Sequence, residues 1–105
     1  MIQETVIREA AHLLRRAAPD ARIVVFGSHA RGNAGPESDV DFLVVEPHVT
    51  SRREESVRLR DVLRPLRIPV DIVVVSAAAF AKWSEIPGTV FHEAAKEGVE
   101  LDGIG

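Results

Sequence analysis

Residues 26–42 have the sequence FGSHARGNAGPESDVDF. They connect two apolar runs, residues 21–26 and 40–45, which are rich in β-branched residues, as buried strands are. Between these runs lie a glycine–serine pair, an arginine and two aspartates separated by one residue. Carboxylates at the beginning of a core strand are costly unless they have partners, so this connector is the first candidate for a site.

Asp39 and Asp41 flank the first residue of the second run. Because side chains alternate along a strand, we expect both carboxylates on one face. They lie at the edge of an apolar surface that Leu43 and Val45 continue. The opposite face is expected to be wholly apolar, with Val40, Phe42 and Val44.

A third carboxylate, Asp71, opens the apolar run 70–75 (VDIVVV) as Asp41 opens its own run. If the two strands are neighbours, Asp71 faces the same pocket, and a buried aspartate among valines needs a partner. Three such acids repel one another unless a cation lies between them, and oxygen ligands favour two magnesium ions, or manganese, over zinc. Each acid alone could be a turn or strand-edge residue; the joint pattern favours a metal site.

Gly27 and Ser28 follow the first strand directly. Glycine there permits a sharp turn and the close approach of a ligand to the backbone. A helical turn over residues 28–31 would direct free N–H groups at a phosphate, and Arg31 could reach the same anion. The alternative is that Ser28 only caps this turn and Arg31 is solvated. Four histidines lack metal-ligand spacing and are expected at the surface, namely His12, His29, His48 and His92.

Apolar periodicity and helix-end signals predict four helices, at residues 2–18, 51–64, 76–83 and 89–96. Ser51 is expected to cap the second helix, with Glu54 completing a capping box. The buried side of that helix is expected to consist of Val57, Val62, Leu63 and Leu66.

The order of these elements is α-β-β-α-β-α-α, and the final residues, ELDGIG, are expected to fray. Such an order indicates an α/β (α+β) domain in which helices cover a small sheet. The length of 105 residues suits one domain, spanning residues 1–105.

The net charge of −3 argues against direct nucleic-acid binding. The chain has no cysteine, and no apolar run approaches the roughly 20 residues that span a bilayer. We therefore expect a cytoplasmic protein without membrane contact. The oligomeric state stays open, because four large apolar residues could close the core or face a second copy or another partner: Phe80, Trp83, Ile86 and Phe91.

The glycine–serine pair, followed after ten residues by DVDF (39–42) and later by Asp71, resembles the signature of the DNA polymerase β-like nucleotidyltransferase superfamily. The stretch GSHARG, the chain length and the ending FHEAAKEGVEL resemble the minimal nucleotidyltransferases of bacteria and archaea. The resemblance covers nearly the whole chain. It implies a small mixed sheet flanked by helices, which binds a nucleoside triphosphate and two magnesium ions.

The resemblance also implies a role for each site residue. Asp39 and Asp41 would bind both metal ions, while Asp71 would bind the catalytic ion and help to deprotonate the attacking hydroxyl. The β- and γ-phosphates would be held by Gly27 and Ser28, assisted by Arg31. The reaction would be in-line transfer of a nucleoside monophosphate with release of pyrophosphate. ATP as the nucleotide follows from the resemblance alone.

Minimal members of this superfamily are commonly encoded beside a HEPN-domain protein, a helical ribonuclease toxin. By resemblance, the chain is expected to be an antitoxin that adenylylates a tyrosine of such a toxin. One alternative is a non-catalytic subunit that masks its partner, although all three acids are retained. Another is transfer to a small molecule such as an aminoglycoside, although the chain has no residues to spare for an acceptor-binding domain.

Overall fold

A mixed four-stranded sheet is the centre of the fold in the computed structural model, which describes residues 4–35 and 38–101. The strand order is β3-β2-β1-β4, in which β2 runs parallel to β3 and β1 runs antiparallel to both its neighbours. The strands are β1 (Arg22–Phe26), β2 (Val40–Glu46), β3 (Val70–Ser76) and β4 (Val99–Leu101). The predicted small mixed sheet flanked by helices is confirmed.

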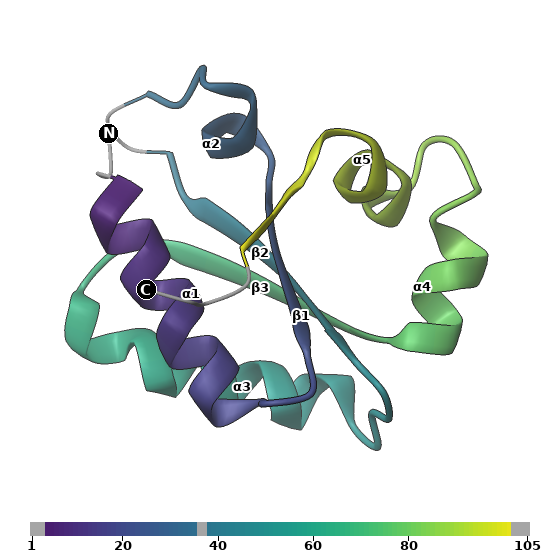
Figure 1. Ribbon diagram of the computed structural model, residues 1–105, viewed down its shortest axis with the longest axis horizontal. Helices are drawn as coiled ribbons and strands as arrows, with labels where there is room; N and C mark the ends of the chain where they lie inside the picture. Colours follow the sequence, from purple (N-terminus) through teal and green to yellow (C-terminus); the bar gives the residue numbers. More distant parts are fainter. Residues whose placement is uncertain (1–3, 36–37, 102–105) are drawn as a thin grey trace.

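Helices cover both faces of this sheet. Figure 1 shows α1 and α3 on one side and α4 and α5 on the other, with α2 at the end where β2 begins. The helices are α1 (Glu4–Ala17), α2 (Ser28–Arg31), α3 (Arg52–Leu63), α4 (Ala77–Trp83) and α5 (Val90–Glu97), and a 3₁₀ turn, η1 (Arg64–Leu66), extends α3. No helix among the described residues has the length and apolar character needed to cross a bilayer. Residues 2 and 3 of the first predicted helix lie outside the described residues.

The alternation of β2 produces two separate cores, as its sequence predicts. Val40, Phe42 and Val44 are buried against α1 and α3 in the larger core. Leu43 and Val45 are buried on the opposite face, in a smaller core that includes residues of α4 and α5. The face of β2 that carries Asp41 is therefore the α4–α5 face.

Side-chain caps fix where three helices begin. The Ser51 hydroxyl accepts a hydrogen bond from the Glu54 N–H at 3.2 Å, as predicted for α3. Ser76 caps α4 through the Ala79 N–H at 3.2 Å, and Thr89 caps α5 through the His92 N–H at 3.1 Å.

The C-terminal segment is more ordered than the sequence suggests. Residues 99–101 form β4, which pairs with β1, and Arg15 donates a hydrogen bond to the Leu101 carbonyl at 2.9 Å. A strand of three residues carries too little periodicity to be recognised in sequence. The prediction that the tail frays is wrong for Glu100 and Leu101, and residues 102–105 lie outside the described residues.

The exposed edge of β3 is partly covered by a side chain of α3. The Arg52 Nε donates a hydrogen bond to the Val74 carbonyl at 2.9 Å. The guanidinium also lies 5.9 Å from the centre of the Phe91 ring, on α5. Arg52 thus occupies a backbone acceptor that would otherwise be open at this edge.

The buried face of α3 differs from the prediction at one position. Val57 is 51% exposed, whereas Leu59 and Leu63, one turn apart, are buried against the sheet. Most residues of α3 are charged or polar, so its few apolar residues fit more than one helical face.

Leu59→Ala is expected to lower the free energy of unfolding by about 2–5 kcal/mol, because it leaves a cavity beneath the sheet. Val57→Ala is the matched control on the same helix and should cost less than about 0.5 kcal/mol. Urea unfolding of both variants measures the difference. Equal costs would contradict the observed face of α3.

Glu46, at the end of β2, interacts with Glu55 of α3, which in turn pairs with Arg58. Arg58 binds both carboxylate oxygens of Glu55, at 2.8 and 2.7 Å, and with the hydrogen bond from Glu46 this lowers the pKa of Glu55 to about 2. Burial, then the hydrogen bond to Glu55, raises the pKa of Glu46 to about 7. Glu46 is therefore the member of the pair that carries the proton.

The pair makes stability depend on pH. In the unfolded chain Glu46 releases its proton near its usual pKa of 4.5, whereas the folded protein keeps it to about 7. The folded protein thus loses stability as pH rises from about 4.5 to about 7, while the contribution of Glu55 changes only between about 4.5 and 2. Glu46→Gln keeps a donor for Glu55 and removes the ionisation.

We expect the melting temperature of Glu46→Gln, relative to the unaltered protein, to rise from pH 5 to just above pH 7 and to change little from there to pH 8. Thermal unfolding followed by circular dichroism at intervals across this range measures it. A difference that is independent of pH, or that falls with pH, would contradict the assignment of the proton to Glu46.

Candidate active site

Two of the predicted acids are register partners in the sheet. Asp41 of β2 lies opposite Asp71 of β3 in the parallel ladder, and opposite Phe26 of β1 on its other side. Asp41 and Asp71 therefore project from the same face, next to each other. This confirms the expectation that the two strands are neighbours; that both acids serve one site stays a prediction.

The exposure of Asp71 differs from the prediction of a buried carboxylate. Its side chain is 57% exposed, and the Arg60 Nη2 of α3 lies 3.8 Å from its Oδ1. Because β3 is an edge strand, its first residues remain open to solvent, and the partner comes from α3 rather than from the strand. Arg60 was not recognised in the sequence, because it lies eleven residues before Asp71 without any motif spacing.

Asp41 is the most constrained acid of the site. Burial raises the pKa of the Asp41 carboxyl, and the nearby charges of Asp71 and Asp39 raise it further. His29 and Arg31 act in the opposite direction. The charges of Asp39 and Asp71 thus act on the Asp41 carboxyl, which is an environment that a bound cation would stabilise.

The three carboxylates are not gathered into a closed ligand cage. In residues 4–35 and 38–101 no group of three or more histidine, aspartate, glutamate or cysteine side chains has the arrangement of a metal centre. Their donor chemistry nevertheless fits magnesium or manganese, which accept carboxylate oxygens and leave positions for phosphate oxygens. Metal binding by Asp39, Asp41 and Asp71 stays a prediction.

Gly27 brings the backbone against the Asp41 carboxylate. It has φ 76° and ψ −153°, and it is the N-cap residue of α2. A Cβ atom at this position would overlap the Asp41 Oδ2. Glycine is therefore required here both by its backbone conformation and by this contact.

Ser28 is the first residue of α2, so the predicted helical turn over residues 28–31 is confirmed. The cap of this turn is Gly27, which removes the alternative that Ser28 serves as the cap. The Arg31 N–H donates to the Gly27 carbonyl at 3.1 Å, and Gly32, with φ 77°, ends the turn.

The Arg31 side chain is held by α5. Its Nη1 lies 3.5 Å from the Glu97 Oε2, and both side chains are 41% exposed. Arg31 is close enough to Asp41 to lower its pKa, so it belongs to the site. A role on phosphate would require it to leave or share Glu97 and stays a prediction.

His29, predicted only as a surface residue, is half-buried and lies next to the site. Its Nδ1 lies 3.1 Å from the Asp39 carbonyl oxygen, and because a carbonyl can only accept, Nδ1 is the donor. Its Nε2 is buried and has no hydrogen-bond partner among the described residues. The His29 side chain thereby joins α2 to the residue that precedes β2. Only its place next to Ser28 could have indicated this in sequence.

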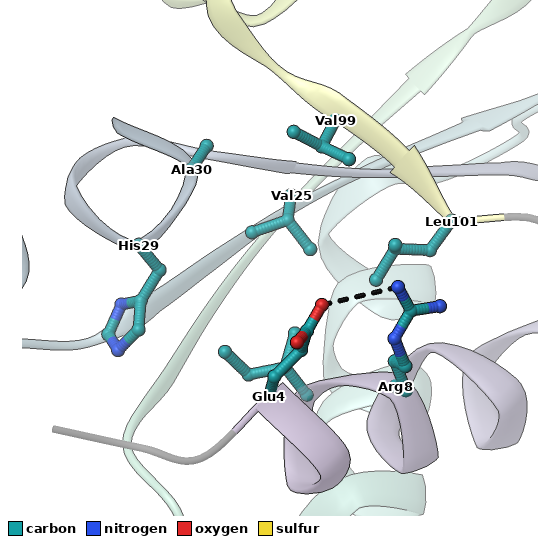
Figure 2. Close-up of a pocket in the computed structure, with 8 residues that line it drawn as sticks. Glu4, Arg8, Val25, His29, Ala30, Val99 and Leu101 are labelled. Carbon is teal, nitrogen blue, oxygen red and sulfur yellow. Dashed lines mark hydrogen bonds and ion pairs between the residues drawn. The ribbon is translucent and has the colours of Figure 1, made fainter. Parts of the chain in front are cut away.

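A small pocket lies beside His29, between α1, α2 and the β1–β4 pair (Figure 2). Its volume is about 120 Å³, and Val25, Ala30 and Leu101 contribute apolar lining. The Glu4–Arg8 ion pair, at 3.2 Å, lies at its α1 side. The pocket is on the α1 side of β1, away from the face that carries Asp41.

Comparison with known proteins gives a family match. The family model described as "Nucleotidyltransferase domain" matches residues 7–95, a range that includes every predicted site residue. Among curated proteins, none matches the chain in sequence.

Solved structures of toxin–antitoxin complexes contain similar chains. One is from a toxin–antitoxin crystallised with AMP-PNP, at 25% identity and a TM-score of 0.60, covering 95% of this chain and 73% of that chain. Another is from the complex of tri-AMPylated Shewanella oneidensis HEPN toxin with MNT antitoxin, at 18% identity and a TM-score of 0.60, covering 95% and 71%. A third, from the MntA–HepT toxin–antitoxin, has 20% identity and a TM-score of 0.61, covering 94% and 71%. The last two likenesses show the fold alone.

Gly27→Ala is expected to lower the free energy of unfolding by about 2–3 kcal/mol, since it combines a left-handed backbone with an overlap on Asp41. Gly32→Ala is a control for positive φ without an overlap: its φ is 77°, but a Cβ there meets nothing within 4 Å, so only about 1 kcal/mol should be lost.

Adding Asp41→Ala separates the two contributions. In that background Gly27→Ala should cost less than in the unaltered protein, because only the cost of the Gly27 backbone conformation remains, as measured by urea unfolding in a double-mutant cycle. A cost for Gly27→Ala that is unchanged by the loss of the Asp41 side chain would contradict the contact.

Proposed function

The chain belongs to the nucleotidyltransferase domain family, and from this premise we propose that it transfers AMP from ATP to a hydroxyl group of a partner protein. The observation that carries the proposal is the pairing of Asp41 with Asp71 at the mouth of two parallel strands, with the Gly27 backbone against the Asp41 carboxylate. Acids and a close-approach glycine are thus together at one end of the sheet.

Each residue has a proposed role in the reaction. Asp39, Asp41 and Asp71 hold divalent cations, magnesium or manganese, and the number of ions proposed is two. When bound, such ions neutralise the triphosphate and lower the pKa of the attacking hydroxyl. The first N–H groups of α2, at Gly27 and Ser28, bind the β- and γ-phosphates, and Arg31 assists.

The covalent change is an in-line displacement at the α-phosphorus. The acceptor oxygen forms a bond to this phosphorus while the bond to the β-phosphate oxygen breaks, and pyrophosphate leaves with that electron pair. Asp71, whose side chain is 57% exposed, takes part in accepting the hydroxyl proton. Its exposure at the edge of the sheet suits an acceptor carried by a separate chain.

The proposed acceptor is a tyrosine of a HEPN-domain toxin, so that the chain acts as a cytoplasmic antitoxin. Support comes from the similar solved chain at 25% identity, which is from a toxin–antitoxin complex with AMP-PNP. The fold is also shared with a chain from a complex of tri-AMPylated HEPN toxin and MNT antitoxin. The alternative of simple masking makes a different prediction for variants that lack the acids.

The test is to incubate the protein with labelled ATP, magnesium and the HEPN-domain protein encoded beside it. We expect label to be transferred to a tyrosine, and Asp39→Asn/Asp41→Asn to reduce the rate about 100-fold or more, because both substitutions remove proposed metal ligands. Asp20→Asn is the control, because this exposed aspartate lies near Glu46, at the opposite end of β2 from the site.

Two outcomes would overturn the proposal. If the unaltered protein transfers no label, the chain is not an adenylyltransferase for this partner. If the double variant neutralises the toxin as fully as the unaltered protein does, masking explains the antitoxin effect.

A further inference from the structure

A basic groove lies beside the proposed active site, between the end of α3 and the start of β3. Its volume is about 390 Å³, within the range of ligand-binding pockets. We call it the arginine groove, and its lining consists of Arg60, Leu63, Arg64, Arg67, Ile68 and Val70. Three cationic heads thus border a floor that includes leucine, isoleucine and valine.

The groove adjoins the third acid of the site. Val70, in its lining, and Asp71 are consecutive in β3 and point to opposite faces, and Arg60 lines the groove while pairing with the Asp71 carboxylate at 3.8 Å. A molecule in the groove would therefore reach Asp71 around the open edge of β3, past Arg60. This is the side from which an acceptor hydroxyl can approach, because β3 is the edge of the sheet.

The three arginines differ in whether they form an ion pair. Arg60 pairs with Asp71, and Arg64 pairs with Asp61 at 2.6 Å. The guanidinium of Arg67 has no ion pair or hydrogen bond with any residue in the described part of the chain. Arg67 is thus the cation of the groove that is available to an external anion.

The backbone of Arg67 indicates that its side chain has a use. It has φ 53° and ψ 40°, and it is the only residue other than glycine with positive φ among residues 4–35 and 38–101. This left-handed position ends η1, where glycine would be the unstrained choice. Arginine at this position carries a backbone cost that glycine would avoid.

We propose that the arginine groove binds an acidic segment of the protein that accepts the nucleotide, with a carboxylate on Arg67 and an apolar side chain on the floor. The proposal rests on the proposed function, since it concerns the acceptor of that reaction. The segment bound in the groove holds the acceptor hydroxyl next to Asp71 and sets which protein is modified.

The charges around the groove favour a protein segment over a nucleic acid. Asp71 and Asp61 already form ion pairs with two of its three arginines, Arg60 and Arg64. A polyanion needs a continuous basic surface, whereas the chain as a whole carries a net charge of −3. One free guanidinium above an apolar floor suits a short segment with an acidic and an apolar residue.

Arg67→Gly is the most informative variant, because it removes the side chain and relieves the backbone at the same time. We expect its melting temperature to equal or exceed that of the unaltered protein. Its KM for the HEPN-domain acceptor should rise about tenfold, with kcat changed less than about twofold, because one charge-assisted contact in binding is lost. The Kd for the same protein without ATP should rise by a similar factor.

Charge reversal supplies the matched control. Arg67→Glu should raise the acceptor KM about 100-fold at low salt, and the effect should shrink as salt is added. Arg16→Glu makes the same change at an exposed arginine near the end of α1, by the opposite end of β2, and should leave KM and Kd unchanged.

The outcomes separate this inference from the proposed function. Absence of transfer by the unaltered protein overturns the proposed function, and the Kd comparison still decides the groove. An unchanged KM and Kd in both Arg67 variants overturns the groove as the acceptor-binding site. Competition by a single-stranded RNA oligonucleotide that Arg67→Glu abolishes would assign the groove to nucleic acid and overturn binding of a protein segment.

Discussion

The parallel pairing of β2 with β3 is the interaction on which the rest of the site depends. It places Asp41 and Asp71 at the same level of the sheet, so that two carboxylates from distant parts of the chain share one environment. Antiparallel pairing of β1 with β2 then returns Gly27 to the same end, against Asp41. A shift of one residue in either ladder would turn a carboxylate to the opposite face of the sheet, so that the acids would no longer lie together.

The cores on the two faces hold this register in place. Beyond Asp41, β2 is buried on both faces, so a slip of one residue would turn the Asp41 carboxylate into the larger core and displace the packed side chains of both cores. The fold therefore tolerates mutual repulsion among acids at one end of the sheet, since the strands are fixed by burial further along. The beginning of β2 and β3 thus carries the acids of the proposed site, and the rest of these strands carries the buried residues that stabilise the fold.

Much of this arrangement could be predicted from sequence, because alternation and helix caps are local signals. The faces of β2, the turn at residues 28–31 and the caps at Ser51, Ser76 and Thr89 all follow from neighbouring residues. Contacts between distant elements could not be predicted in this way. Pairing of β4 with β1, the ion pair of Arg60 with Asp71, and the packing of Leu59 in place of Val57 each depend on how separate elements meet.

The hydrogen bond of Arg52 at the edge of β3 bears on whether copies of the protein associate through their sheets. The sheet ends at β3, whose edge is parallel, apolar and seven residues long, as a strand that recruits a further strand would be. By occupying the Val74 carbonyl, the Arg52 guanidinium places a charge where another copy would have to pair. The beginning of β3, at Asp71, therefore stays accessible to an acceptor. The later part of the same strand, at Val74, is protected by Arg52 against pairing with a further strand.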